Sequence, residues 1–234
     1  MRSILIYKIT IFLFVLTHGD CKKSENIAGV ATFVKGTPVV ERNSKKIEIK
    51  LNDRIQEGDV LTTDEKSLVI LTFNNELGEV EIQQNSELSI DSFLSNKKSL
   101  HLKKGNVWTK ITKLSKSDEF NLHSPTCVAG VRGTKFYTFQ FGEYSGTCHC
   151  EGNIQLELKG QKYNEVNKED ILVVSKNGKS IVIVPSQLKI KRPYDDRHNH
   201  SQIENSSLGK KNDMTDEDLK KMFANIEERF KELK

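Results

Sequence analysis

The residues best suited to chemistry in this chain are its cysteines and the histidines near them. Cys148, His149 and Cys150 are consecutive, and Cys127 and His123 lie upstream. Thiolate and imidazole groups are good ligands for zinc and copper, so this set suggests a metal site. On a β-strand, however, Cys148 and Cys150 share one face while His149 points to the other, so these three side chains cannot easily meet one ion.

A disulfide is the simpler use of these cysteines, and it is our prediction. Cys127 can reach Cys148 or Cys150 if their strands are neighbours. Apart from Cys21 the chain has three cysteines, an odd number that leaves at least one unpaired within a monomer. Free thiols and a metal site remain the alternatives.

Other catalytic arrangements are missing from the sequence. The histidines lie apart from any nucleophile elbow, because the serine-rich segments lack the glycine framing of a strained strand-to-helix turn. The glycines do not have the spacing of a phosphate-binding loop, and no Lys-Ser or Lys-Thr pair follows them at the required place. We therefore expect neither an enzyme nor a cofactor.

Length and charge narrow the class of protein further. The chain has 234 residues, of which 36% are hydrophobic, and this is enough for one sizeable domain with appendages. The formal net charge is +4 and the lysines are scattered along the chain. This is not the concentrated basic surface of a nucleic-acid-binding protein, so we expect no nucleic-acid partner.

The most constrained stretch runs from Ser124 to Thr134 and, apart from the Cys127 thiol, carries no group for covalent chemistry. Pro125 fixes its own φ and makes Ser124 extended, while Gly130 and Gly133 permit backbone angles that other residues avoid. We interpret the stretch as a corner between strands. Its one charged residue, Arg132, is expected to bond backbone carbonyls or a carboxylate rather than a ligand.

This stretch, Ser-Pro-Thr-Cys-Val-Ala-Gly-Val-Arg-Gly-Thr, resembles the TPT-x-VAGVRGT signature of FecR domains. These are envelope domains known from iron-dicitrate sensing regulators and from stand-alone surface proteins. The residues that match the signature are Pro125, Thr126, Val128, Ala129, Gly130, Val131, Arg132, Gly133 and Thr134.

Other segments continue the resemblance at similar spacing, so that it covers about residues 27–185. Gly58-Asp59-Val60-Leu61-Thr62-Thr63 is similar to the family's G-D-x-L-x-T step. Leu102 to Trp108 is similar to its L-x-x-G-x-V-W step, and Glu151-Gly152 matches a Glu-Gly step. Trp108, the single tryptophan, is expected to anchor the sheet rather than stack on a ligand.

The N-terminus has the layout of a bacterial secretion signal, predicted over residues 1–20. Arg2 and Lys8 flank the start of an apolar run from Ile9 to Leu16, and Cys21 follows. The stretch before Cys21 resembles a lipoprotein processing site of the loose kind seen in spirochaetes, although Asp20 departs from the usual small residue. We expect export, lipidation of Cys21, and a location on the periplasmic face of a membrane or at the cell surface.

The remaining boundaries follow from composition and periodicity. Residues 21–26 form a polar tether, 27–185 a FecR-like β domain, and 186–213 a polar linker expected to be disordered. Residues 214–234 carry apolar side chains at helical spacing after an acidic first turn, which predicts an amphipathic helix. It could pack on the β domain, on another helix or, less readily, on a membrane surface.

The predicted fold is therefore all-β, with short strands stacked as a β-roll or solenoid and a C-terminal amphipathic helix. A two-sheet β-sandwich is the alternative, because turn spacing cannot separate the two. We expect a non-enzymatic, envelope-anchored binding or scaffold protein whose partner is an envelope protein or a cell-wall component.

The resemblance also implies a second function, a part in relaying a receptor's ligand state to a sigma factor. The apolar run is shorter than the roughly 20 residues of a membrane span, which favours the scaffold over the relay. A thiol or metal protein centred on Cys148 to Cys150 is a further alternative.

Overall fold

The structure is a computed structural model that describes residues 26–112, 114–125, 128–158, 161–166, 171–183 and 216–233. It consists of one fifteen-stranded sheet, a 3-10 turn and a C-terminal helix. The elements are β1 (Ile27–Lys35), β2 (Val39–Arg42), β3 (Lys45–Glu48), β4 (Arg54–Gln56), β5 (Val60–Thr62), β6 (Leu68–Phe73), η1 (Asn74–Glu76), β7 (Gly78–Ile82), β8 (Glu87–Ser92), β9 (Lys97–Ile111), β10 (Glu119–His123), β11 (Val128–Phe141), β12 (Tyr144–Leu158), β13 (Gln161–Val166), β14 (Ile171–Lys176), β15 (Lys179–Ile183) and α2 (Asp216–Glu232).

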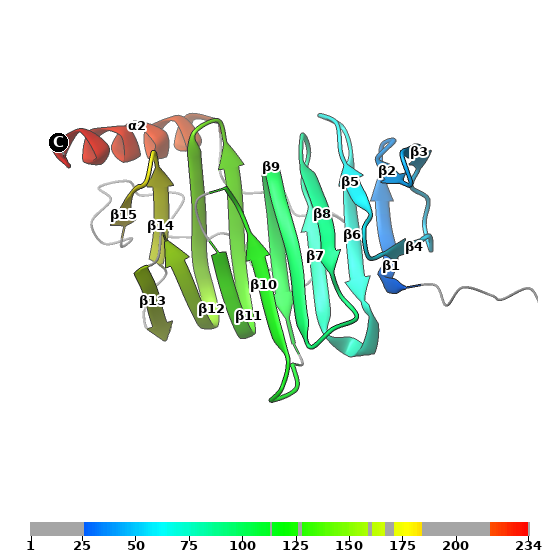
Figure 1. The fold of residues 1–234 in the computed structure, drawn as a ribbon. Coiled ribbons are helices and arrows are strands. Elements are labelled where there is room, and N and C mark those ends of the chain that lie inside the picture. The colour runs from blue at the N-terminus through cyan, green and yellow to red at the C-terminus, as the bar shows by residue number, and fades with distance from the viewer. Residues whose placement is uncertain are drawn as a thin grey trace, which may run out of the picture.

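Strand pairing divides the sheet into two layers that share their three longest strands. The first layer has the order β3-β2-β5-β8-β9-β10-β11-β12-β13. The second layer has the order β4-β1-β6-β7-β9-β11-β12-β14-β15. In β9, β11 and β12 one half of the strand belongs to each layer. The strands stand side by side, with β1 to β4 at one end and β13 to β15 with α2 at the other (Figure 1).

The prediction of an all-β fold with a C-terminal helix is confirmed. The chain passes repeatedly from one layer to the other, as in a roll, while most neighbouring strands are antiparallel, as in a sandwich. The pair formed by β9 and β10 is parallel. The three shared strands have 14 or 15 residues and are longer than the short strands expected.

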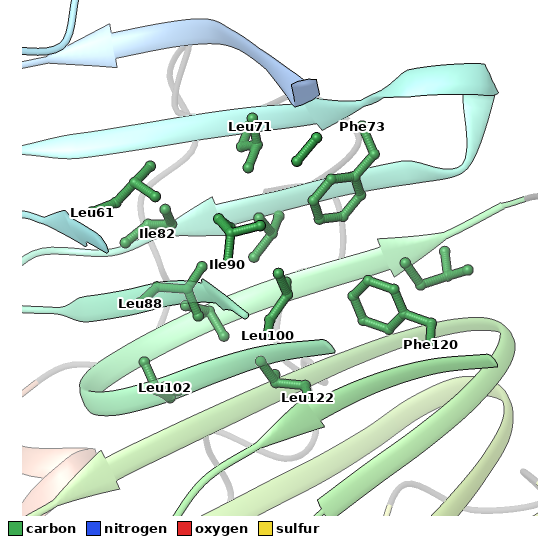
Figure 2. Packing of buried hydrophobic residues seen from close by; sticks show 14 of the residues in the cluster. Leu61, Leu71, Phe73, Ile82, Leu88, Ile90, Leu100, Leu102, Phe120 and Leu122 are labelled. Carbon is green, nitrogen blue, oxygen red and sulfur yellow. The ribbon is translucent and has the colours of Figure 1, made fainter. Parts of the chain in front are cut away.

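The main core lies between the two layers. Phe73 of the second layer has its ring centroid 5.7 Å from that of Phe120 in the first, and 4.8 Å from that of Phe93. Leucine and isoleucine side chains from both layers fill the same space, as Figure 2 shows. Each fully buried side chain of this kind contributes roughly 1.5–3 kcal/mol, so this interior is the main source of stability. The labelled members are Leu61, Leu71, Phe73, Ile82, Leu88, Ile90, Leu100, Leu102, Phe120 and Leu122.

Several sequence-based predictions lie outside the described residues. These are the signal segment, the lipidation site Cys21 with most of its tether, and the linker of residues 186–213. Within the described residues, no helix combines the length and apolar character needed to span a bilayer.

Candidate functional site

Three glycines bend the shared strands where each strand leaves one layer for the other. The partner strand changes at Gly105 in β9, at Gly133 in β11 and at Gly152 in β12. Their φ angles are 85°, 58° and 90°, in the left-handed region that glycine enters without steric cost. Because these glycines bend the strands without ending them, each strand serves both layers.

The corner of the signature is closely packed against the corner of β12. A Cβ atom on Gly152 would lie 2.0 Å from the carbonyl oxygen of Gly133, so a side chain cannot be placed there. The buried His149 lies on the same strand, and its Nε2 donates a hydrogen bond of 2.9 Å to the Gly152 carbonyl. Gly133 of the signature and Gly152 of the Glu-Gly step therefore form one closely packed unit. This agrees with the interpretation of the signature as a corner.

The rest of the signature forms the first half of β11. Pro125 follows β10, and Thr126 and Cys127 lie outside the described residues. The backbone from Val128 to Val131 pairs with β10 on one side and β12 on the other, and Thr134 is buried beyond the corner. Ala129 and Val131 face the core. The backbone of Arg132 pairs with that of Asn153, and the role of its side chain stays a prediction.

Asp59 of the Gly-Asp step holds the turn between β4 and β5. Its carboxylate accepts hydrogen bonds from Arg42 Nε and Nη2 at 2.7 and 2.6 Å, and from the Gln56 backbone N–H at 2.7 Å. The Asp59 side chain is buried, and Arg42 Nη2 also donates to the Arg54 carbonyl at 2.8 Å. A buried carboxylate with this many donors is a structural group, because its lone pairs are used within the fold.

The cysteine prediction cannot be completed within the described residues. Cys148 is buried in β12, where its backbone pairs with Tyr137 and Leu172. Cys127 lies outside the described residues and the side chain of Cys150 is not described, so the disulfide stays a prediction. The described residues contain no group of three or more His, Cys, Asp or Glu side chains placed to hold a metal ion.

The outer face of the second layer is apolar and aromatic over its β9, β11, β12, β14 and β15 part. We call this surface the aromatic face. Helix α2 covers it, and the Phe139 ring lies over Gly146, where an added Cβ would come within 2.2 Å of the ring. The residues of the aromatic face are Trp108, Tyr137, Phe139, Phe141, Tyr144, Cys148, Leu172, Val174, Ile181 and Ile183.

Three apolar side chains of α2 rest on the aromatic face. The ring of Phe223 lies 6.0 Å, centroid to centroid, from each of the rings of Phe139, Phe141 and Tyr144, in edge-to-face geometry. Phe230 lies 6.1 Å from Tyr144, and Ile226 is fully buried between these two anchors. Aromatic pairs of this geometry add about 0.5–1.5 kcal/mol each to their burial.

Polar contacts hold α2 to the edge of the sheet. Lys176 Nζ lies 3.3 Å from a Glu227 carboxylate oxygen and also donates to the Tyr144 hydroxyl. Arg229 Nη1 donates to the Val182 carbonyl of the edge strand β15 at 3.0 Å. Figure 1 shows α2 at the end of the sheet that holds β14 and β15. The helix therefore covers both a face and an edge of the second layer.

A buried acid lies on the same outer face of the second layer. Glu81 of β7 pairs with Trp108 of β9 and is 3% exposed. Gln83 Nε2 donates to its Oε1 at 2.5 Å, and its Oε2 has no hydrogen-bond partner among the described residues. Burial raises the pKa of Glu81 to about 7, because the charged form is poorly solvated there.

The outer face of the first layer is polar instead. We call its central part the polar face, and it includes Ser89, His101, Asn121, His123 and Gln155. His101 and His123 are directly opposite in the parallel pair, with ring centroids 6.4 Å apart. Burial and the neighbouring His101 charge lower the pKa of His123, while Asp91 opposes this shift. The polar face has donors and acceptors but no apolar anchor comparable to that of the aromatic face.

Comparison with known proteins supports the resemblance over part of the chain. Residues 59–154, about two fifths of the chain, match the family model described as FecR protein. This range runs from Asp59 to Ile154 within β12 and includes all three glycine corners. The match thus supports the FecR-like character of this stretch, which includes the signature and extends well before it.

Structural comparison adds a distant likeness. Two crystal structures of a protein described as an anti-sigma factor from Parabacteroides distasonis, at 1.65 and 2.50 Å resolution, are similar at 11% identity with TM-scores of 0.48 and 0.47. Each alignment covers 62% of this chain and 73% of the other. No curated protein matches the sequence. At this identity and TM-score the likeness carries no functional argument.

Sequence reasoning missed the aromatic face, although a signal for it was present. Phe136 faces the main core, whereas Phe139 and Phe141 face the other way. A strand with large apolar side chains on both faces is typically covered on both sides. Glu81 and the pairing of Arg42 with Asp59 had no such signal, because they depend on contacts between separate strands.

Proposed function

We propose that the chain is a non-catalytic FecR-like component of a signal relay in the cell envelope, and that it acts by binding a partner protein. The observation that carries the proposal is the FecR match over residues 59–154, which spans the corners that join the two layers. This match favours the relay over the scaffold role expected first, since FecR domains are known from iron-dicitrate sensing regulators.

The geometry is consistent with binding rather than catalysis. The described backbone of the signature, from Val128 onward, takes part in strand pairing and bending, and the Asp59 carboxylate accepts three hydrogen bonds within the fold. The aromatic face offers a large apolar surface of the kind found at the centres of protein interfaces. We therefore propose that the partner contacts the β domain and that the chain catalyses no reaction.

The experiment compares transcription in cells with and without the protein. If the chain is part of a relay, its deletion changes the expression of a small set of genes, and the wild-type gene restores them. A deletion that leaves every transcript unchanged while altering envelope composition contradicts the relay and supports the scaffold role. Purified protein that turns over a small molecule contradicts the assignment as non-catalytic.

A further inference from the structure

We infer that the aromatic face is a helix-binding site, that α2 occupies it as an internal competitor, and that the partner contributes an amphipathic helix to the same place. This inference rests on the proposed function, because it names the chemistry of the partner's contact. It concerns the outer face of the second layer, which is covered by α2, a segment that is not part of the sheet.

The face and its cover belong to different parts of the chain. The β9, β11 and β12 portion of the face, with Trp108, Phe139 and Tyr144, lies inside the FecR match of residues 59–154. Helix α2 lies outside that match and is joined to β15 through residues 184–215. The FecR-like body thus carries much of the apolar surface by itself, and a C-terminal appendage supplies the cover.

The contacts of α2 define which helix the site accepts. Apolar side chains are needed at Phe223, Ile226 and Phe230, which are spaced i, i+3 and i+7 on one face of a helix. A carboxylate at the position of Glu227 meets Lys176, and an arginine at the position of Arg229 meets the edge carbonyl of β15. A partner helix with this pattern makes the same contacts, which is the helix-in-groove mode of recognition.

The contacts that hold α2 on the aromatic face are of a kind that another helix could replace. Most of the stability of a helix in a protein comes from the packing of its apolar face, so α2 is ordered chiefly by this docking. The Lys176–Glu227 pair is partly exposed, with side-chain exposures of 19% and 43%, so it adds little holding energy. Because α2 belongs to the same chain as the aromatic face, its docking is intramolecular, and an outside helix must compete with it.

The test keeps the full chain and makes α2 separable. A protease site is placed within residues 186–213, the purified protein is cleaved, and a fluorescein-labelled synthetic peptide of residues 214–234 is added. Fluorescence anisotropy should show saturable binding to the cleaved protein and at least about tenfold weaker binding to the uncleaved protein. A Phe230→Ala peptide should bind at least about tenfold more weakly, and a peptide with the exposed Ala224 changed to Ser should bind like the parent.

Three outcomes overturn the inference. The cleaved protein could lose its β-sheet circular dichroism, which would make α2 a permanent part of the core. The labelled peptide could fail to exchange while the cleaved helix stays bound through gel filtration. The uncleaved chain could be a dimer that takes up no peptide, which would make the second copy's α2 the occupant.

This test and the transcription experiment fail independently. Peptide exchange reports on the aromatic face whether or not a relay exists. If deleting the gene changed no transcript while the peptide still exchanged, the proposed function would be wrong and the helix-binding site would remain supported.

Discussion

The two outer faces of this protein are built on the same three strands and yet differ in almost every physical property. The polar face, with His101 and His123, presents hydrogen-bonding groups to solvent and has no covering element among the described residues. The aromatic face is apolar and lies beneath α2. One strand can serve both faces because a glycine bends it between the layers: β9 contributes His101 to the polar face and Trp108 to the aromatic face.

The largest expected effect comes from a change that breaks both faces at once. Gly152→Ala places a Cβ 2.0 Å from the Gly133 carbonyl oxygen, and we expect a loss of about 4 kcal/mol or more in the free energy of unfolding. Gly133→Asn is the matched control, since its φ of 58° suits asparagine and nothing lies within 4 Å of the added Cβ. Urea denaturation measures both. Equal stability of the two variants would contradict the close packing of Gly152 against the Gly133 carbonyl.

The next prediction separates the two faces. Phe139→Ala removes a buried ring beneath α2 and should lower the free energy of unfolding by about 3–5 kcal/mol. Gln155→Ala, on the exposed polar face, should change it by less than about 0.5 kcal/mol. Thermal and urea denaturation give the comparison. Similar losses for both variants would show that the aromatic face is not a packed interface.

The third prediction concerns the pH dependence of the aromatic side. The pKa of Glu81 rises from an ordinary 4.5 to about 7, so the folded chain binds a proton that the unfolded chain releases between these values. Its contribution to stability is therefore present at low pH and is lost as the pH rises from about 4.5 to 7. Glu81→Gln should raise the free energy of unfolding by about 2–3 kcal/mol at pH 8 and flatten this dependence.

A suitable control for Glu81 is Glu87→Gln. Glu87 forms a partly exposed ion pair of 3.0 Å with Lys103 on the first layer, so its replacement should change stability by less than about 1 kcal/mol. A Glu81→Gln variant that is less stable than wild type at pH 8 would show that the carboxylate has a partner and is not poorly solvated.

The smallest effect is expected on the polar face, and it has the opposite sign. The pKa of His123 is lowered by burial and by the charge of His101, so the folded chain binds fewer protons than the unfolded chain. Stability is then lost as the pH falls below about 6.5. His123→Gln should reduce this acid sensitivity by under about 1 kcal/mol, measured by denaturation at pH 5 and pH 7.5. If the His123→Gln variant lost as much stability between pH 7.5 and pH 5 as the wild type, His123 would not be the source of the acid sensitivity.

The sequence predicted those features that depend on local pattern. Ile154 and Leu156 stand at alternate positions, the pattern of a strand with one buried face, and both are buried. The glycine and proline content of the signature predicted a corner, and the backbone turns at Gly133. Ile47, Ile49 and Leu51 also stand at alternate positions, but only Ile49 is buried, because β3 is an edge strand that ends at Glu48.

Features that depend on pairing between distant strands could not be predicted in this way. Nothing local indicates that Glu81 pairs with Trp108 or that Arg42 reaches Asp59. The packing of α2 was left open by its amphipathic pattern, since the same stripe fits a sheet, another helix or a membrane. Only the strand order shows that the aromatic side chains of β11 and β12 gather under that helix.

The most direct test of the central claim is photo-crosslinking from the two faces in intact cells. A photoreactive phenylalanine analogue replaces Phe141 on the aromatic face in one strain and Gln155 on the polar face in another. The account predicts that one partner protein is crosslinked from position 141 and not from position 155, and that excess α2 peptide suppresses the adduct. A partner captured only from position 155 would contradict it.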